Sequence, residues 1–253
     1  MKQFLLTAII AAMTVSLNVQ CATSHASENY NGLELSSRET SERNLKIKKS
    51  FSKVVVKTGV RLFYTVGSAN TVRIFGQEDQ VEHTVVTVED GTLQIYLKRD
   101  ELSKKPAETN VAVYVNAPAF SYAAMNSGAI FTLDSEMSVS GSFSVQSSSG
   151  SIFKSDKGLK CGSLFISPSS GSIVDISGIS AGVAKVSSSS GAIVTLKGTA
   201  TKLDAHISSG SIANLTDLKA KEGSVHASSG AIVNVSKGMI DTHSSSGAIV
   251  NKK

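Results

Sequence analysis

The sequence predicts an all-β protein whose C-terminal half is a parallel β-helix, or β-solenoid, of about seven coils. A strand-rich N-terminal half is expected to pack on this solenoid or to continue it. The first observation is a short motif, Ser-Gly-(Ala/Ser)-Ile, that recurs seven times between residues 121 and 253. The second is a series of short β-branched runs, separated by turn residues, in the region before the repeats. A repeat of about 20 residues is typical of solenoids, and such runs are typical of strands.

The repeat is marked by a glycine that returns at intervals of 22, 21, 20, 19, 20 and 17 residues. A serine precedes each glycine, and an alanine or a serine follows it. A chain that reverses direction between stacked strands needs a residue that tolerates a positive φ, which glycine adopts without a Cβ clash. We therefore interpret each motif as a structural corner. The corner glycines are Gly128, Gly150, Gly171, Gly191, Gly210, Gly230 and Gly247.

An isoleucine lies two residues after every corner glycine. Equivalent residues of successive coils stack about 4.8 Å apart, as in any pair of strands, so these isoleucines form one column. We expect this column to point inward as the core of the solenoid. Apolar residues seven and five positions before the glycine, and five positions after it, predict further inward columns. The predicted core column is Ile130, Ile152, Ile173, Ile193, Ile212, Ile232 and Ile249.

Four segments follow from composition along the chain. Residues 1–26 are expected to be a signal peptide, and residues 27–44 a polar, flexible lead-in. Residues 45–120 form the N-terminal β region, in which Asp90-Gly91 predicts a tight hairpin. Residues 121–253 hold the solenoid repeats, and 45–253 are expected to form one domain.

The N-terminus predicts export. Lys2 precedes an apolar stretch over residues 4–17 that is too short to span a bilayer comfortably. A lipid anchor at Cys21 is an alternative, but the residues before Cys21 lack the small residue that lipoprotein processing normally needs. If Cys21 is removed with the signal, Cys161 is the only thiol left and no intramolecular disulfide can form. We expect a periplasmic, outer-membrane-associated or extracellular protein, with no transmembrane segment in the mature chain.

The charge and the aromatic content of the chain limit the classes of partner that can be expected. The net charge is only +5 over 253 residues, and the basic residues are scattered, so nucleic acid is not an expected partner. Aromatic residues make up 6% of the chain and Trp is absent, which predicts a polar or aliphatic binding surface. The expected partner is an envelope, matrix or carbohydrate ligand that the sequence does not identify further. The oligomeric state is not predicted.

Two external columns carry polar side chains. Four residues before their glycines, the last three coils hold His206, His226 and His243, which are expected to form an outward ladder. Imidazoles on adjacent strands are candidate metal ligands, but neither Cys residues nor a dense carboxylate set flanks them, so no metal and no cofactor are expected. Four residues after the glycine, the column ends in Asn214, Asn234 and Asn251. We interpret these three as a structural amide ladder.

The chain carries no signature of catalysis. It has no nucleophile elbow, no His-Glu-x-x-His, no phosphate-binding glycine loop and no dinucleotide fingerprint. Polysaccharide lyases and hydrolases also use β-solenoids, and they need clustered acids. Most aspartates of the repeat region fall at different offsets from their glycines, which predicts that most of them lie on different faces: Asp156, Asp175, Asp204, Asp217 and Asp241. No catalytic residue is therefore assigned.

The repeats, together with Phe51-Ser52-Lys53-Val54 and the segment from Glu89 to Ile95, resemble a known family. This is the family of putative auto-transporter adhesins with a head GIN domain, which is common in Bacteroidetes, and the resemblance covers residues 45–253. It implies a secreted or envelope-held β-solenoid with an adhesin-like role, and it brings no catalytic residues. We therefore expect a non-catalytic exported surface protein that binds, or supports structure, through a solenoid face. The alternative is a polysaccharide lyase or hydrolase on the same scaffold.

Overall fold

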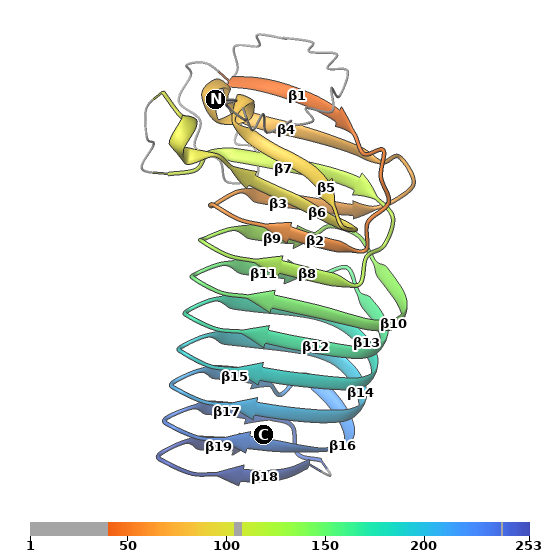
Figure 1. Ribbon diagram of the computed structural model, residues 1–253. Coiled ribbons are helices and arrows are strands. Elements are labelled where there is room, and N and C mark those ends of the chain that lie inside the picture. Colours follow the sequence, from red (N-terminus) through yellow and green to blue (C-terminus); the bar gives the residue numbers. More distant parts are fainter. Residues whose placement is uncertain (1–39, 104–107, 239) are drawn as a thin grey trace, which may run out of the picture.

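The computed structural model describes residues 40–103, 108–238 and 240–253. These residues are predominantly strand, as predicted, and their strands form one elongated hydrogen-bonded stack (Figure 1). The expected signal peptide (1–26), Cys21 and residues 27–39 of the lead-in lie outside the described residues. Residues 40–44, which were expected in the lead-in, instead begin the first strand, β1 (Thr40–Lys46).

Each coil of the solenoid consists of a pre-corner strand segment, a Ser-Gly corner and a post-corner strand segment, and in β13 and β14 the post-corner segment of one coil continues into the pre-corner segment of the next. Both kinds of strand pair in parallel with their counterparts in neighbouring coils. The C-terminal region has about six turns, since seven corners bound six intervals. Its strands are β8 (Tyr122–Met125), β9 (Ile130–Leu133), β10 (Met137–Ser147), β11 (Ile152–Ser155), β12 (Leu159–Pro168), β13 (Ile173–Ser188), β14 (Ile193–Ile207), β15 (Ile212–Leu215), β16 (Leu218–Ala227), β17 (Ile232–Val235), β18 (Ile240–Ser244) and β19 (Ile249–Lys252).

The N-terminal half continues the stack with two more coils, but their stacking order differs from their order in the chain. β2 (Lys53–Val56) and β3 (Arg61–Val66) form the coil next to β8 and β9. β6 (Thr92–Leu97) and β7 (Val111–Ala117) pair in parallel with the other side of β2 and β3. The β2–β3 coil is therefore held between two coils that both come later in the chain.

Antiparallel strands and two short helices close the N-terminal end of the stack (Figure 1). β4 (Thr71–Gln77) pairs with β7 on one side and with β1 on the other. β5 (Thr84–Glu89) forms with β6 the hairpin that Asp90-Gly91 predicted. The helices are α1 (Glu78–Glu82) and the 3-10 helix η1 (Arg99–Glu101). Such strands cover an edge that would otherwise offer unpaired backbone groups to other chains.

The seven predicted corners share one backbone geometry. The glycines have φ between 68° and 74°, as predicted, and the serine before each also has a positive φ, between 51° and 56°. The residue after each glycine donates a backbone hydrogen bond across the corner to the residue before the serine, as Ser151 does to Ser148 at 3.2 Å. Each corner glycine from Gly128 to Gly230 also donates to the corner serine of the next coil. The corners therefore stack as a ladder along one edge of the molecule (Figure 1).

The isoleucine column lies in register from coil to coil, but the prediction that it forms the core is wrong. The column points outward, with its members from Ile130 to Ile212 partly exposed and the last two exposed by 37% and 53%. The residues three positions after the glycine are buried instead: Phe131, Phe153, Val174, Val194, Ala213 and Val233. Side chains alternate between the two faces of a strand. The residue five positions after the glycine is buried, so the residue three positions after the glycine lies on the same inner face. The isoleucine two positions after the glycine lies on the opposite, outer face.

One continuous core runs along the stack. The predicted inward columns before the corner are buried, including Phe143, Leu164 and Leu203. Near β8 and β9 the core is aromatic, and Tyr64, Phe120 and Phe131 lie in ring contact. Toward the C-terminus smaller side chains such as Ala205 and Ala213 replace them. Because these columns fill the interior, residues available for binding lie on the outside of the stack.

Candidate binding faces

The outer side of the post-corner strands, from β9 to β19, carries the seven isoleucines and is called here the isoleucine face. Strand pairing aligns Ile130 with Ile152, and so on to Ile232 with Ile249. Because every member is at least partly exposed, the column forms an apolar stripe parallel to the axis of the solenoid. The seven isoleucines are separated by six steps of about 4.8 Å, which makes the stripe roughly 30 Å long.

An amide ladder lies beside the C-terminal half of the stripe. The Nδ2 of Asn234 donates to Oδ1 of Asn214 at 2.9 Å, and Nδ2 of Asn251 donates to Oδ1 of Asn234 at 3.0 Å. The predicted structural role of these asparagines is confirmed, since each amide is engaged by its neighbour along the stack. The ladder fixes the flat outer surface next to the isoleucines.

At its N-terminal end the isoleucine face becomes aromatic, which composition alone did not predict. The rings of Phe63 and Tyr114 stack with centroids 5.1 Å apart, and the guanidinium of Arg73 lies 4.6 Å from the Tyr114 centroid. Phe63 occupies the outward position that Thr132 holds in the next coil. This cluster could not be predicted from the sequence, because Phe63, Arg73 and Tyr114 belong to three strands whose order in the stack has no local signal.

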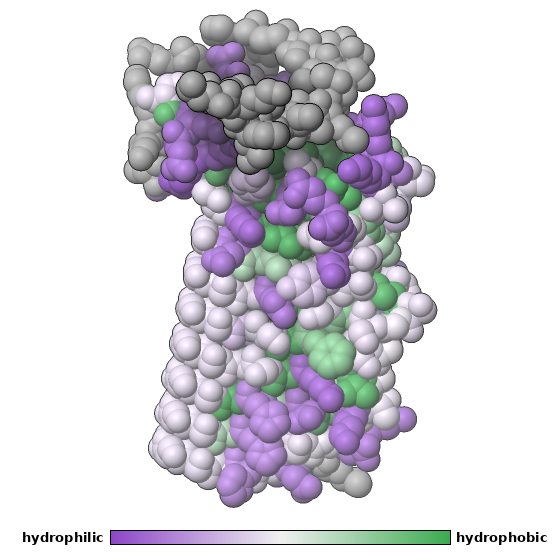
Figure 2. Space-filling view, viewed as in Figure 1, coloured by the Kyte–Doolittle hydropathy of each residue, from purple (hydrophilic) through white to green (hydrophobic). Residues whose placement is uncertain are grey.

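The outer side of the pre-corner strands is called here the histidine face, after the ladder at its C-terminal end. His206, His226 and His243 are exposed and aligned on successive strands, as predicted. The first two rings are parallel within 7° with centroids 5.0 Å apart, and the last two are 5.9 Å apart and inclined by 51°. Nε2 of His206 lies 3.3 Å from Oδ1 of Asp204. Hydrophilic side chains gather over these coils, while small side chains line the corner edge (Figure 2).

The first two rings of the histidine ladder stack face to face instead of pointing toward one shared point. Within residues 40–103, 108–238 and 240–253, no group of three or more His, Cys, Asp or Glu is placed to hold a metal ion. Parallel rings on adjacent strands direct their nitrogens side by side, whereas ligands of one metal must converge on a point. The geometry therefore favours stacking over coordination.

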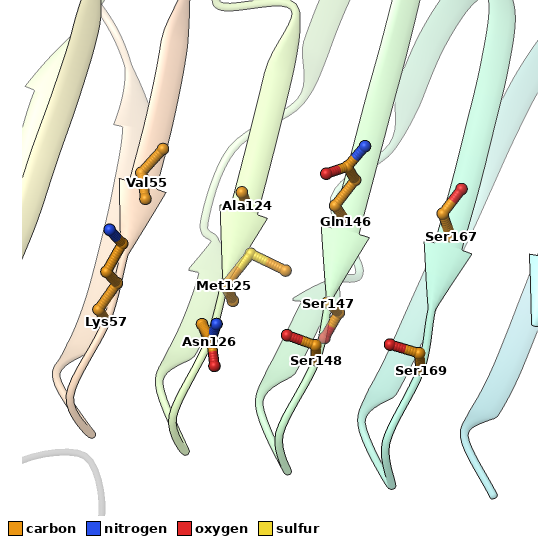
Figure 3. Close-up of a pocket in the computed structure, with 10 residues that line it drawn as sticks. All are labelled: Val55, Lys57, Ala124, Met125, Asn126, Gln146, Ser147, Ser148, Ser167 and Ser169. Carbon is orange, nitrogen blue, oxygen red and sulfur yellow. The ribbon is translucent and has the colours of Figure 1, made fainter. Parts of the chain in front are cut away.

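A groove of about 250 Å³ crosses the histidine face near β2, β8, β10 and β12 (Figure 3). One row of side chains follows the strand centres and a second row lies beside the corners. The first row is Val55, Ala124, Gln146 and Ser167, and the second is Lys57, Asn126, Ser148 and Ser169. Sequence reasoning missed this groove because Val55 and Lys57 meet Ala124 and Asn126 only through the changed stacking order of the β2–β3 coil.

Two carboxylates do share an offset from their glycines. Asp134 and Asp156, six residues after Gly128 and Gly150, are exposed neighbours on the post-corner side. Partial burial and the nearby Asp156 raise the pKa of the Asp134 carboxyl, while Lys157 lowers it. Only Asp156 of this pair was among the aspartates compared by offset, so the pair was not predicted. A second cavity, of about 690 Å³, lies near the C-terminal end and is lined by Lys202, Glu222, Asp241 and Lys252 among others.

Cys161 is free and buried in the solenoid wall. Burial raises the pKa of its thiol to about 11. A thiol with a raised pKa is mostly protonated at neutral pH and reacts slowly.

In the described parts of the chain, no helix is both long and apolar enough to cross a bilayer.

Solved structures of three bacterial proteins share this fold. A putative adhesin from Parabacteroides merdae has a TM-score of 0.75 and 12% identity, and the match covers 85% of this chain and 97% of that chain. A putative lipid binding protein from Parabacteroides distasonis has a TM-score of 0.75 and 13% identity, and this match covers 85% of this chain and 97% of that chain. A putative adhesin from Parabacteroides distasonis has a TM-score of 0.68 and 16% identity, and this match covers 85% of this chain and 94% of that chain. At these identities the likeness shows the fold alone.

No curated protein matches the chain. A family profile does match, over residues 50–252, and it covers both the N-terminal coils and all of the repeats. The resemblance drawn from the repeats, the hairpin and the order of the two halves is thereby confirmed. This chain belongs to the family described as "Putative auto-transporter adhesin, head GIN domain".

Proposed function

We propose that the protein is an exported, non-catalytic, adhesin-like surface protein that binds an extended envelope, matrix or carbohydrate partner through its isoleucine face. Membership of an adhesin family and the adhesin-like structural neighbours support a non-catalytic adhesin-like role. The observation that carries the choice of face is the outward register of the seven isoleucines. Contiguous exposed apolar surface with a polar border is characteristic of interaction sites.

The shape of the face indicates what kind of partner it suits. A stable interface between globular proteins buries about 800 Å² on each partner. The isoleucine stripe is one side chain wide, so it suits a narrow, linear partner lying along the axis better than a broad globular one. The Phe63–Tyr114 pair and Arg73 would add an aromatic and cationic end to such a site, and side chains of these types are enriched among binding hot spots. A glycan chain or an extended polypeptide has the required form.

Export is part of the proposal. The apolar stretch over residues 4–17 after Lys2 has the form of a secretory signal, and it supports delivery to the periplasm, the outer membrane or the exterior. Fractionation of cells that produce the protein tests this part. Recovery of the full-length protein from the cytoplasm alone would overturn it.

A glycan, matrix-protein and lipid array tests the binding function. Lipids are included because one structural neighbour carries a lipid-binding description. The test variant replaces Ile173, Ile193 and Ile212 by Ser, which removes the centre of the stripe. The matched control replaces Lys185, His206 and His226 by Ser at outward positions of the opposite face. Both variants are first compared with the unaltered protein by thermal unfolding.

Saturable binding that the isoleucine variant loses and the control keeps is the expected result. Equal binding by both variants would remove the isoleucine face from the proposal. Shortening of an arrayed polysaccharide would replace adhesion by catalysis, and the Asp134–Asp156 pair would then be the first target of mutation. Binding without loss of substrate supports the non-catalytic role.

A further inference from the structure

We propose that the groove between β2, β8, β10 and β12 is a second binding site, separate from the isoleucine face, for a carboxylate-bearing sugar of an acidic glycan. The inference goes beyond the proposed function, because the groove lies on the histidine face, on the other side of the corner edge. Four coils contribute to it, and one of them is the out-of-order β2–β3 coil (Figure 3).

The hollow exists because two outward positions carry small side chains. Val55 and Ala124 are paired across β2 and β8, and the next strand carries the longer Gln146 at the equivalent position. The buried Met125 also lines the groove. Val55, Ala124 and Met125 thus give the groove an apolar part that can contact the C–H face of a sugar ring.

The polar groups around this apolar part present hydrogen-bond donors. The hydroxyl of Tyr122 donates to Oε1 of Gln146 at 2.7 Å, so the Gln146 amide nitrogen is left as a donor. Burial raises the pKa of Tyr122, which keeps this hydroxyl protonated and donating. The hydroxyl of Ser127 likewise donates to Oδ1 of Asn126 at 3.2 Å, which leaves the Asn126 amide nitrogen as a second donor.

Charge supports an acidic ligand. The ammonium of Lys57 lies at one end of the corner-side row, and no Asp or Glu is among the residues that line the groove. Within the described residues, Lys57 forms no ion pair. A cation with two amide donors matches a carboxylate, since charge-assisted hydrogen bonds are the stronger kind. The hydroxyls of Ser148, Ser167 and Ser169 can donate or accept, as sugar hydroxyls require.

Size limits the occupant to about one sugar unit. A volume of about 250 Å³ lies just below the range of roughly 300–1,000 Å³ typical of small-molecule sites. The rest of a glycan would continue along the histidine face, where the corner-side row extends through Ser189, Ser208 and Ser228. The site is therefore suited to one acidic residue inside a longer chain.

Isothermal titration with a trimer of galacturonic acid tests the proposal. The critical variant is Lys57→Gln, and the matched control is Lys53→Gln, which removes another exposed lysine, four residues earlier at the start of β2, that does not line the groove. Loss of a charge-assisted bond should weaken binding by about tenfold for Lys57→Gln. The Lys53 variant should bind like the unaltered protein. Ala124→Phe fills the groove without changing charge and should abolish binding.

Further ligands and variants show whether the binding is specific for this groove. A neutral galactose trimer should bind much more weakly, and acetate should not compete at equal concentration. Equal losses for the Lys53 and Lys57 variants would mean non-specific charge attraction and would overturn the proposal, as would no binding at all or equal binding of the neutral trimer. The isoleucine variant described above should bind the galacturonic acid trimer normally, so failure of one site is distinguishable from failure of the other.

Discussion

Ile193 and Val194 are consecutive residues of β14, yet their side chains lie on opposite sides of the solenoid wall. Val194 is fully buried in the core, and Ile193 is partly exposed on the isoleucine face. Both residues stack on their counterparts from the neighbouring coils, so both belong to continuous columns. The two columns differ in function, because one stabilises the fold and the other is available to a partner.

Aspartate substitutions at these two positions should separate the roles. Val194→Asp places a charge in the core and should lower the free energy of unfolding by more than about 4 kcal/mol. Ile193→Asp should cost about 1 kcal/mol, mainly through lost strand propensity. Urea unfolding followed by circular dichroism measures both. A larger effect at Ile193 than at Val194 would reverse the assignment of inside and outside.

The corner glycines should be required because they adopt a positive φ, and not because a larger side chain would clash with its neighbours. A Cβ at Gly191 would meet no atom within 4 Å, but its φ of 70° is left-handed. Gly191→Ala should therefore destabilise the protein by about 1–2 kcal/mol. Gly141 also has open space but no positive φ, so Gly141→Ala is a matched control that should be neutral or stabilise by about 0.5 kcal/mol. Equal effects of the two substitutions would refute the conformational argument.

The central asparagine of the amide ladder should contribute more than its column neighbours. Asn234 both donates to Asn214 and accepts from Asn251. Asn234→Ala should cost about 1–2 kcal/mol through the loss of two hydrogen bonds. Thr195→Ala, in the same column two coils away, reports the cost of placing alanine at such a position. The ladder would have no net stabilising role if the two variants unfolded at the same urea concentration.

Cys161 should be protected from alkylation. A pKa of about 11 lowers the thiolate fraction at neutral pH by about a hundredfold relative to a thiol near its ordinary value. Iodoacetamide should modify the peptide containing Cys161 slowly in the folded protein and rapidly in urea, as read by mass spectrometry. Rapid labelling without denaturant would show that this part of the wall opens readily.

Zinc should not bind tightly to the histidine ladder, since the stacked rings of His206 and His226 do not converge. Calorimetric titration of the protein at micromolar concentration should give no saturable heat. His226→Gln removes the middle ring and serves as the control. Saturable heat that disappears in this variant would show that the rings rearrange around a metal.

The sequence allowed accurate prediction wherever a single periodic argument sufficed. Equal offsets from the corner placed His206 beside His226 and Asn214 beside Asn234, because stacking follows directly from the repeat. The direction of the isoleucines needed a second argument, from strand alternation, and the inward position of Leu196 should already have placed Ile193 outside. The groove at Lys57 and Ala124 depended on pairing between segments with no shared repeat, and no local pattern indicates such pairing.

The position of the β2–β3 coil sets the order in which the protein can fold. A chain delivered N-terminus first presents residues 53–66 before either of their neighbouring coils exists. These valine-rich strands remain without parallel partners until residues 92–117 and then 122–133 arrive. Pairings between distant segments form slowly, and unpaired strand edges invite aggregation while they wait. The β2–β3 coil is therefore completed only after residues 92–133 have emerged, although its own strands are among the first to appear.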